Sequence, residues 1–117
     1  MFKEKIKKYY DLVDSNEFEK LFSLFSSKII YFRCEQKIEG IENVKGFYLN
    51  ERKIKGEHKI NKIIQSEKTI FVLGVFSGKN SLGKKIKLDF VDLFEFDNTG
   101  KIIERKTYLA TGYDQTI

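Results

Sequence analysis

Apolar side chains in the first 25 residues recur with the period of an α-helix. Between residues 2 and 13 they follow the i, i+4, i+7, i+8 spacing of one helix face, at Phe2, Ile6, Tyr9, Tyr10 and Val13. Turn-forming residues follow at 14–16, and a second short helix is predicted to face inward through Phe18, Leu21, Phe22 and Phe25. The chain is therefore expected to begin with two amphipathic helices.

Beyond these helices the pattern changes to that of strands. Residues 28–33 are β-branched and aromatic and predict a strand, and a short extended segment around Ile38 ends at Gly40. Val44, Phe47 and Tyr48 are spaced for one face of a third short helix. Four consecutive strands are then predicted at 58–65, 69–77, 84–97 and 101–109, with a hairpin turn at 98–100 between the last two.

The order of these elements indicates the fold class. Helices that precede a run of antiparallel strands are typical of an α+β fold, in which a helix layer packs on a curved sheet. The chain has 117 residues, so we interpret residues 1–117 as a single domain. The sequence contains no glycine-rich phosphate loop.

Composition excludes several classes of protein. No apolar run approaches the roughly 18 residues of a membrane-spanning helix, and no signal peptide is evident, so a cytoplasmic protein without a membrane partner is expected. The lone Cys34 cannot form an intramolecular disulfide, and together with one histidine it cannot supply the roughly four ligands of a structural zinc site. Cys34 is interpreted as a small semi-buried thiol, and no metal or cofactor is expected.

The net charge of +5 does not indicate a nucleic-acid partner. Of the 22 basic residues 19 are lysines, which are spread along the chain and interleaved with glutamate. Base readout and bidentate phosphate contacts favour arginine, of which the chain has three. The charge is therefore interpreted as a solvated lysine-rich surface.

Asp92 is the strongest candidate for chemistry. In a strand it shares one face with Leu88, Phe90, Phe94 and Phe96, so its carboxyl group interrupts an apolar stripe. Burying that charge without a partner would cost several kcal/mol, so a raised pKa or a dedicated partner is expected. Asp89 and Glu95 fall on the other face and are predicted to lie on the outside of the sheet, solvated or at a dimer contact.

The order and spacing of several short segments carry a family likeness, which runs over about residues 6–109. The chain resembles the nuclear transport factor 2-like superfamily, and within it the branch of ketosteroid isomerases and SnoaL-like polyketide cyclases. The segments that carry the likeness are residues 9–14, 18–19, 29–32, 38–40, 47–48, 88–97 and 100–102. The resemblance implies a cone-shaped fold with three helices and a deep apolar pocket, often a homodimer formed through the outer face of the sheet. The family includes isomerases, cyclases, dehydratases and epoxide hydrolases, as well as many non-enzymes, so the fold alone does not fix the function.

The resemblance also assigns roles to residues. Asp92 matches the hydrogen-bond-donating aspartate of the isomerases, and Tyr9 matches their oxyanion-donating tyrosine, with Tyr10 as an alternative one residue away. Phe32 stands where the isomerase general base is expected, and a phenylalanine cannot accept a proton. Glu35 is either a substitute base, reached by a rearranged loop, or an exposed loop carboxylate. Arg33 either binds a substrate carboxylate or points outward.

His58 is the one histidine of the chain and begins a predicted strand. Family members with a histidine at this place imply an acid/base pair of His58 with Asp92, which suits an imidazole that titrates near neutrality. The alternative is a surface histidine beside Glu57.

Together these residues predict a small-molecule acid/base enzyme of the isomerase, cyclase or dehydratase type, acting on a hydrophobic carbonyl compound without a cofactor. Asp92 and Tyr9 would polarise the carbonyl oxygen and His58 would move a proton. A small hydrophobic or aromatic ligand is expected to contact Tyr10, Phe32, Phe47, Phe90 and Phe94. The alternative is a non-catalytic ligand-binding or dimerisation module, in which Asp92 is structural and phenylalanine side chains fill the pocket.

Overall fold

The helical elements lie in the first half of the chain, in a computed structural model that describes residues 2–33, 35–51 and 55–109. Helix α1 spans Phe2–Asp14 and α2 spans Phe18–Phe22. Helix α3 spans Ile41–Gly46 and continues into a π-helical turn, η1, at Phe47–Glu51. The three predicted helices are confirmed, but Phe25 begins a strand rather than ending α2. Cys34 lies outside the described residues.

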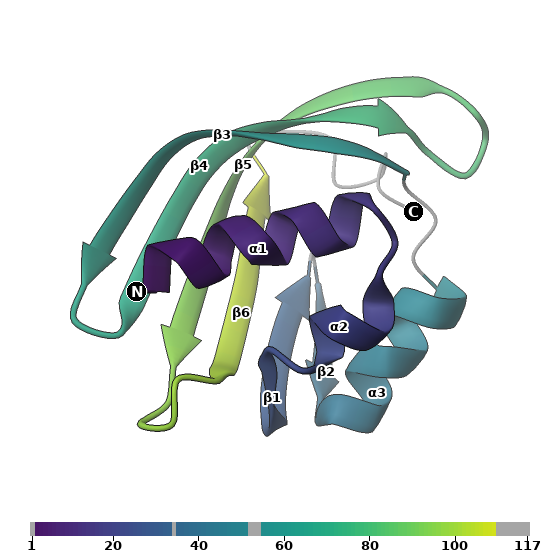
Figure 1. The fold of residues 1–117 in the computed structure, drawn as a ribbon. Coiled ribbons are helices and arrows are strands. Elements are labelled where there is room, and N and C mark those ends of the chain that lie inside the picture. The colour runs from purple at the N-terminus through teal and green to yellow at the C-terminus, as the bar shows by residue number, and fades with distance from the viewer. Residues whose placement is uncertain (1, 34, 52–54, 110–117) are drawn as a thin grey trace.

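Six strands form one sheet (Figure 1) in the order β2-β1-β6-β5-β4-β3. Neighbouring strands are antiparallel except β1 and β6, which run parallel. The strand bounds are Phe25–Arg33 for β1, Gln36–Glu39 for β2, Lys55–Ser66 for β3, Thr69–Lys79 for β4, Lys85–Phe96 for β5 and Ile102–Leu109 for β6. All six predicted extended segments are therefore confirmed, with shifts of a few residues at their ends.

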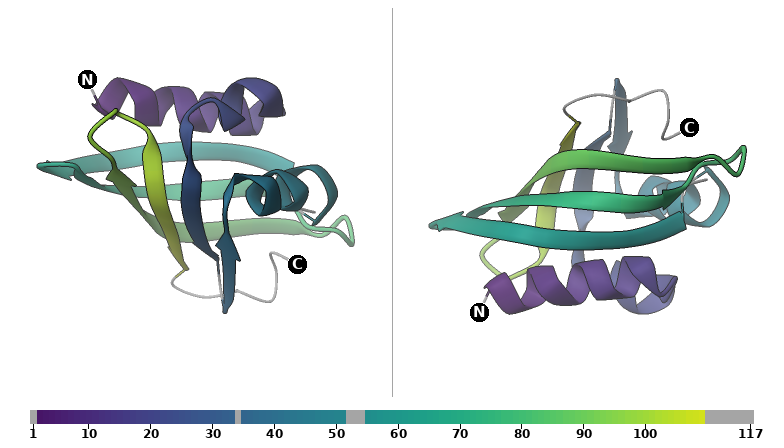
Figure 2. Two further views of the ribbon diagram at one scale, coloured as in Figure 1. Left: turned by 90° about the horizontal axis from the view of Figure 1, so that it is seen from below. Right: turned by 90° about the horizontal axis from the view of Figure 1, so that it is seen from above.

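The helices cover one face of this curved sheet. Figure 2 shows α1 running beside β3, while α2 and α3 lie near β1 and β2. The arrangement confirms the α+β class and the helix layer on a curved sheet. None of the described helices is long and apolar enough to cross a membrane.

The alternation predicted for the longest strand is present in β5. Its even-numbered residues from Ile86 to Phe96 are buried, and Asp92 among them is only 1% exposed. On the opposite face Asp89 is exposed, and Glu95 is half-buried and accepts a hydrogen bond from the Thr69 hydroxyl. The inward position of Asp92 and the outward positions of Asp89 and Glu95 therefore agree with the period-two pattern.

The hairpin between β5 and β6 is built from local hydrogen bonds. One carboxylate oxygen of Asp97 accepts the backbone N–H groups of Thr99 and Lys101. Gly100 closes the turn at φ +84°, a conformation that glycine adopts without steric cost. Beyond the turn the register shifts by one position between Glu95 and Phe96, and the resulting pairing places Arg105 opposite Phe94 and Thr107 opposite Asp92.

Candidate functional site

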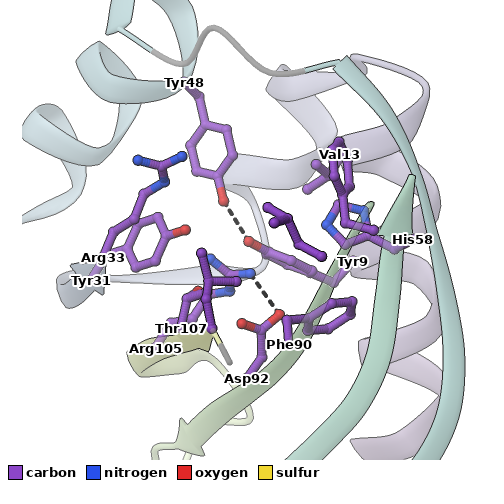
Figure 3. A pocket seen from close by; sticks show the side chains of 13 residues that line it. Tyr9, Val13, Tyr31, Arg33, Tyr48, His58, Phe90, Asp92, Arg105 and Thr107 are labelled. Carbon is purple, nitrogen blue, oxygen red and sulfur yellow. Dashed lines mark hydrogen bonds and ion pairs between the residues drawn. The ribbon is translucent and has the colours of Figure 1, made fainter. Parts of the chain in front are cut away.

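A small cavity lies between the helix layer and the sheet (Figure 3). Its volume is about 50 Å³. One ordered water needs roughly 10–15 Å³ on this measure, so the cavity admits a few heavy atoms or the reactive end of a larger molecule. The lining side chains come from α1, η1 and five strands, and are Tyr9, Val13, Tyr31, Arg33, Tyr48, His58, Phe76, Leu88, Phe90, Asp92, Arg105, Thr107 and Leu109. The wall is largely apolar, through Val13, Phe76, Leu88, Phe90 and Leu109, and polar side chains from α1, η1, β1, β3, β5 and β6 complete it.

Asp92 has a dedicated charged partner in the cavity wall. Nη2 of Arg105 donates to Oδ2 of Asp92 at 2.9 Å, and both side chains are almost fully buried. The hydroxyl of Tyr10 donates to the same oxygen. The expectation that a buried Asp92 needs a dedicated partner is confirmed, and the partner is a guanidinium that cannot give up its charge.

Arg105 is held in an aromatic box as well as by Asp92. Its guanidinium carbon lies 4.6 Å from the ring centre of Tyr31, 5.0 Å from that of Tyr9 and 5.4 Å from that of Phe94. Burial acts to lower the pKa of Arg105, but the Asp92 charge and the neighbouring tyrosines hold that pKa well above its ordinary value. The guanidinium is therefore a permanent positive charge in the wall of the cavity.

Several polar atoms of this wall remain unpaired. Among the residues that the structure describes, none accepts from or donates to Oδ1 of Asp92, Nε and Nη1 of Arg105 or Oγ1 of Thr107, all of which are buried. Buried polar atoms without partners are uncommon in folded proteins, and those that occur often mark functional sites. We refer to these three residues as the Asp92–Arg105–Thr107 cluster.

His58 pairs with Asp14 rather than with Asp92. Its Nδ1 lies 2.6 Å from Oδ1 of Asp14, and its backbone N–H donates to Oδ2 of the same carboxylate at 2.8 Å. A carboxylate only accepts hydrogen bonds, so Nδ1 carries the proton and Nε2 is the ring nitrogen left for a ligand. The expected His58–Asp92 pair is thus replaced, because the end of α1 places Asp14 against the beginning of β3.

The imidazole of His58 is also fixed by aromatic contacts. Its ring centre lies 4.9 Å from that of Phe76, 5.0 Å from that of Tyr10 and 5.4 Å from that of Phe90. Its side chain is only 10% exposed, so the surface histidine that was the alternative is not what the structure contains. A carboxylate-oriented imidazole at a cavity is an arrangement suited to general base chemistry.

The two candidate tyrosines have separate partners. The Tyr9 hydroxyl lines the cavity and shares a hydrogen bond with the Tyr48 hydroxyl of η1 (Figure 3). Tyr10 lies behind the wall and bonds to Asp92. Burial is the main cause that raises the pKa of both hydroxyls, and for Tyr10 the Asp92 charge raises the pKa further. Both phenols are therefore protonated near neutral pH.

The predicted ligand-contacting phenylalanines divide into three groups. Phe90 lines the cavity, whereas Phe47 and Phe94 are buried and not part of its lining. Phe32 is on the other face of β1, where the amines of Lys37 and Lys106 lie over its ring, so it cannot contact a ligand in the cavity. Tyr31 takes the inward position because side chains alternate along a strand.

Arg33 at the end of β1 and Glu35 just after it lie in different surroundings. Arg33 lines the cavity and its guanidinium lies 5.1 Å from the Phe47 ring centre, so it does not point outward. Glu35 is exposed, as an ordinary loop carboxylate. Glu35 is not among the described residues that line the cavity, so the substitute base that the sequence allowed in this loop is not found there.

The sequence interpretation missed four residues of the site: Asp14, Tyr48, Arg105 and Thr107. For Arg105 and Thr107 a count from the predicted turn at 98–100 is off by one position. It places residues 104 and 106 opposite Phe94 and Asp92, and a register shift between Glu95 and Phe96 brings Arg105 and Thr107 there instead. The positions of Asp14 and Tyr48 depend on how helices dock on the sheet, which the local pattern does not show.

Comparisons with known proteins bear on the family and the fold of this chain. The family model of the SnoaL-like domain matches residues 6–105. A search of curated proteins finds no match to this chain.

Solved structures share the fold at low sequence identity. An NTF2-like protein of unknown function from Exiguobacterium sp. 255-15 is 24% identical, with a TM-score of 0.80, over 92% of this chain and 98% of the other. A candidate SnoaL-like polyketide cyclase from Shewanella denitrificans OS-217 is 14% identical, with a TM-score of 0.82, over 97% and 92%. An LEH-like epoxide hydrolase from M. tuberculosis is 13% identical, with a TM-score of 0.78, over 95% and 82%. These structures show that the chain has the fold of NTF2-like proteins. Because the family model covers most of the chain, the protein belongs to the SnoaL-like domain family.

Proposed function

We propose that this protein is an acid/base enzyme of the isomerase, cyclase or dehydratase type that moves a proton on a small carbonyl compound bound in the cavity. The observation that carries the proposal is the Asp14–His58 pair, in which Nδ1 of a cavity-lining imidazole is held at 2.6 Å by a carboxylate. Proton abstraction next to a carbonyl needs a base within reach and a positive or hydrogen-bonding group at the oxygen.

His58 is the proposed base. With Nδ1 held by Asp14, Nε2 accepts the proton, and the Asp14 carboxylate stabilises the imidazolium that forms. Asp14 acts here as a positioning residue, because it touches His58 and not the ligand.

Arg105 is the proposed electrophilic group. Its buried guanidinium supplies donors and a fixed charge for the oxygen that becomes negative during proton abstraction. This assignment differs from the expectation that Asp92 donates, since Oδ2 of Asp92 already accepts from Tyr10 and Arg105. Asp92 instead holds the guanidinium in place, and Tyr9 with its Tyr48 partner offers a further hydroxyl at the cavity.

The neighbouring structures are compatible with this class of reaction. A polyketide cyclase candidate and an epoxide hydrolase share the fold. A protein with a ketosteroid isomerase-like fold from Catenulispora acidiphila was solved in complex with trimethylamine, so this fold can hold a ligand of very few atoms.

The test is deuterium incorporation into small ketones in heavy water, followed by proton NMR. The protein is expected to exchange the protons next to the carbonyl faster than buffer does. In His58→Gln the exchange rate is expected to be at least about 100-fold lower, the smallest effect usual for the loss of a general base. Exchange no faster than buffer, or equal exchange by the variant, would contradict the proposal.

The alternative is a ligand-binding module without turnover. The small cavity and the structural partnership of Asp92 with Arg105 favour it. It predicts saturable binding of small ketones with no deuterium incorporation, so the same samples distinguish the two functions.

We also propose that two copies of the chain form a homodimer through the outer face of the sheet. That face carries Phe71 and Tyr108, exposed by 38% and 50%. Sedimentation of the protein and of Phe71→Lys tests it: a dimer that the substitution weakens is expected, and a monomer would contradict it.

A further inference from the structure

The Asp92–Arg105–Thr107 cluster presents an acceptor that needs a donor. Asp92 is a carboxylate whose Oδ2 accepts from Tyr10 and Arg105, while its buried Oδ1 accepts from none of the described residues. A carboxylate oxygen has no proton to give, so it is satisfied only by an O–H or N–H group. A simple ketone provides no such group.

The same cluster presents donors that need an acceptor. Nε and Nη1 of Arg105 are buried and donate to none of the described residues. Guanidinium nitrogens only donate, so they are satisfied by an oxygen with free lone pairs, such as a carbonyl oxygen. Oγ1 of Thr107 lies on the neighbouring position of the same strand face and can serve either role.

The charge of the cluster is balanced before any ligand enters. One carboxylate and one guanidinium meet at 2.9 Å, so the pair is neutral as a whole. The other guanidinium of the cavity wall, that of Arg33, lies over the Phe47 ring and is not part of the cluster. Burying a further charge beside it would cost desolvation energy that a neutral ligand avoids. The cavity volume of about 50 Å³ limits the part of the ligand that reaches the cluster to a few heavy atoms.

From this complementarity we propose that the cavity recognises a neutral α-hydroxy ketone, whose carbonyl oxygen accepts from Arg105 and whose neighbouring hydroxyl donates to Oδ1 of Asp92. The inference rests on the proposed function and names its substrate class. Removal of a proton from the carbon that carries the hydroxyl gives an enediolate: the C–H bond breaks, the proton goes to Nε2 of His58, and the electron pair moves to the carbonyl oxygen beside Arg105. No oxidant or reductant is needed.

The test is binding, measured by amide chemical-shift changes in NMR titrations of the whole chain. The probes are hydroxyacetone, butan-2-one, which has a methyl group in place of the hydroxyl, and acetate as an anion. Hydroxyacetone is expected to bind at least about fivefold more tightly than butan-2-one, the ratio expected for one net hydrogen bond of about 1 kcal/mol. The perturbed amides are expected on β5 and β6 around the cluster.

Thr107→Val provides a matched variant, because valine has the same shape and is suited to a strand. The unpaired Oγ1 of Thr107 is the group of the cluster that can donate to the ligand hydroxyl while this hydroxyl donates to Asp92. The variant is therefore expected to bind hydroxyacetone several-fold more weakly and butan-2-one unchanged. Equal affinity for the two ketones, tighter binding of acetate than of hydroxyacetone, or no saturable shift with hydroxyacetone would each overturn the inference.

The failures of the two proposals are distinguishable. If the ketones bind equally but deuterium exchange still depends on His58, the substrate class is wrong and the proton-transfer function stands. If hydroxyacetone is preferred but no exchange occurs, the recognition stands and the enzymatic function is wrong.

Discussion

Arg105 and Asp92 meet in the interior of the protein, with Nη2 of the guanidinium 2.9 Å from Oδ2 of the carboxylate. The side chains are 6% and 1% exposed, so neither charge has water as a substitute partner. Each charge is therefore tolerated only because the other is present. This dependence makes the pair a structural element of the fold as well as the polar wall of the cavity.

Removing one partner of this pair is expected to be costly. Asp92→Ala leaves the Arg105 charge buried without compensation, and the free energy of unfolding is expected to fall by about 3–5 kcal/mol. Asp89→Ala is the matched control, since Asp89 is exposed on the same strand, and it is expected to change stability by less than about 0.5 kcal/mol. Urea denaturation measures both, and similar losses in the two variants would contradict the account.

Tyr10 is expected to stabilise the ion pair through its hydroxyl. Tyr10→Phe removes the donor to Oδ2 of Asp92 and keeps the ring, so a loss of about 1.5–3 kcal/mol is expected, the range for a hydrogen bond to a charged group. Tyr108→Phe removes a hydroxyl from a half-exposed ring and serves as the control. Equal stability of the two variants in urea would show that the Tyr10 hydroxyl contributes nothing.

Stability is expected to fall at alkaline pH because of Tyr9 and Tyr10. Burial raises the pKa of both hydroxyls well above 10.0, and the Asp92 charge raises that of Tyr10 further. Above pH 10 the unfolded chain releases these protons while the folded chain still holds them, so the unfolding free energy decreases as pH rises. The stability from the raised pKa values is fully present below pH 10 and is lost as pH rises toward the folded values.

Tyr10→Phe checks the assignment of this pH dependence. The variant lacks one of the two groups, so its unfolding free energy should decrease less steeply between pH values just below and well above 10. Urea titrations at a series of pH values measure the slope. Identical slopes for the protein and the variant would contradict the role of Tyr10.

Atoms of the two neighbouring strands lie very close to Gly74 on β4. A Cβ atom there would lie 2.4 Å from the backbone oxygen of Lys59 and 2.8 Å from Cζ of Phe90, which lines the cavity. Gly74→Ala is therefore expected to lower stability by about 1–3 kcal/mol, the usual cost of overpacking. Gly46→Ala, where a Cβ meets nothing within 4 Å in helix α3, is expected to raise stability by up to about 1 kcal/mol. Thermal denaturation compares them, and a neutral Gly74→Ala would show that the strands can separate there.

The part of the site that lies on β5 could be predicted because the sequence of that strand alone indicates which side chains face inward. A period of two along Leu88, Phe90, Asp92 and Phe94 fixes which side chains face inward, whatever the rest of the chain does. Arg105 could not be placed in the same way, because a register shift between Glu95 and Phe96 moves it one position away from a count that starts at the turn before β6. Burial of a charge predicted that a partner exists, and only the sheet register identifies it.

The His58 partner could not be predicted in the same way. Asp14 ends α1 and lies 44 positions before His58, so the contact depends on how α1 packs on the sheet. Tyr31 and Phe32 could not be told apart either. Alternation along β1 requires that one of them faces the cavity but does not say which, and in the structure it is Tyr31. Period-based prediction was sufficient for β5, and insufficient for β6 with its register shift and for contacts between layers.

The central claim is that Asp14 and His58 act as one unit in proton transfer, and a double-mutant cycle on the deuterium-exchange rate tests it most directly. The protein, His58→Gln, Asp14→Asn and the double variant are compared on hydroxyacetone, with Asp11→Asn as the control on the exposed side of α1. Each single variant is expected to lose at least about 100-fold of the rate, and the double variant to be no slower than His58→Gln, because residues that act as a unit are not additive. Exchange rates that stay at the level of the unmodified protein in His58→Gln, or losses that simply multiply in the double variant, would contradict the claim.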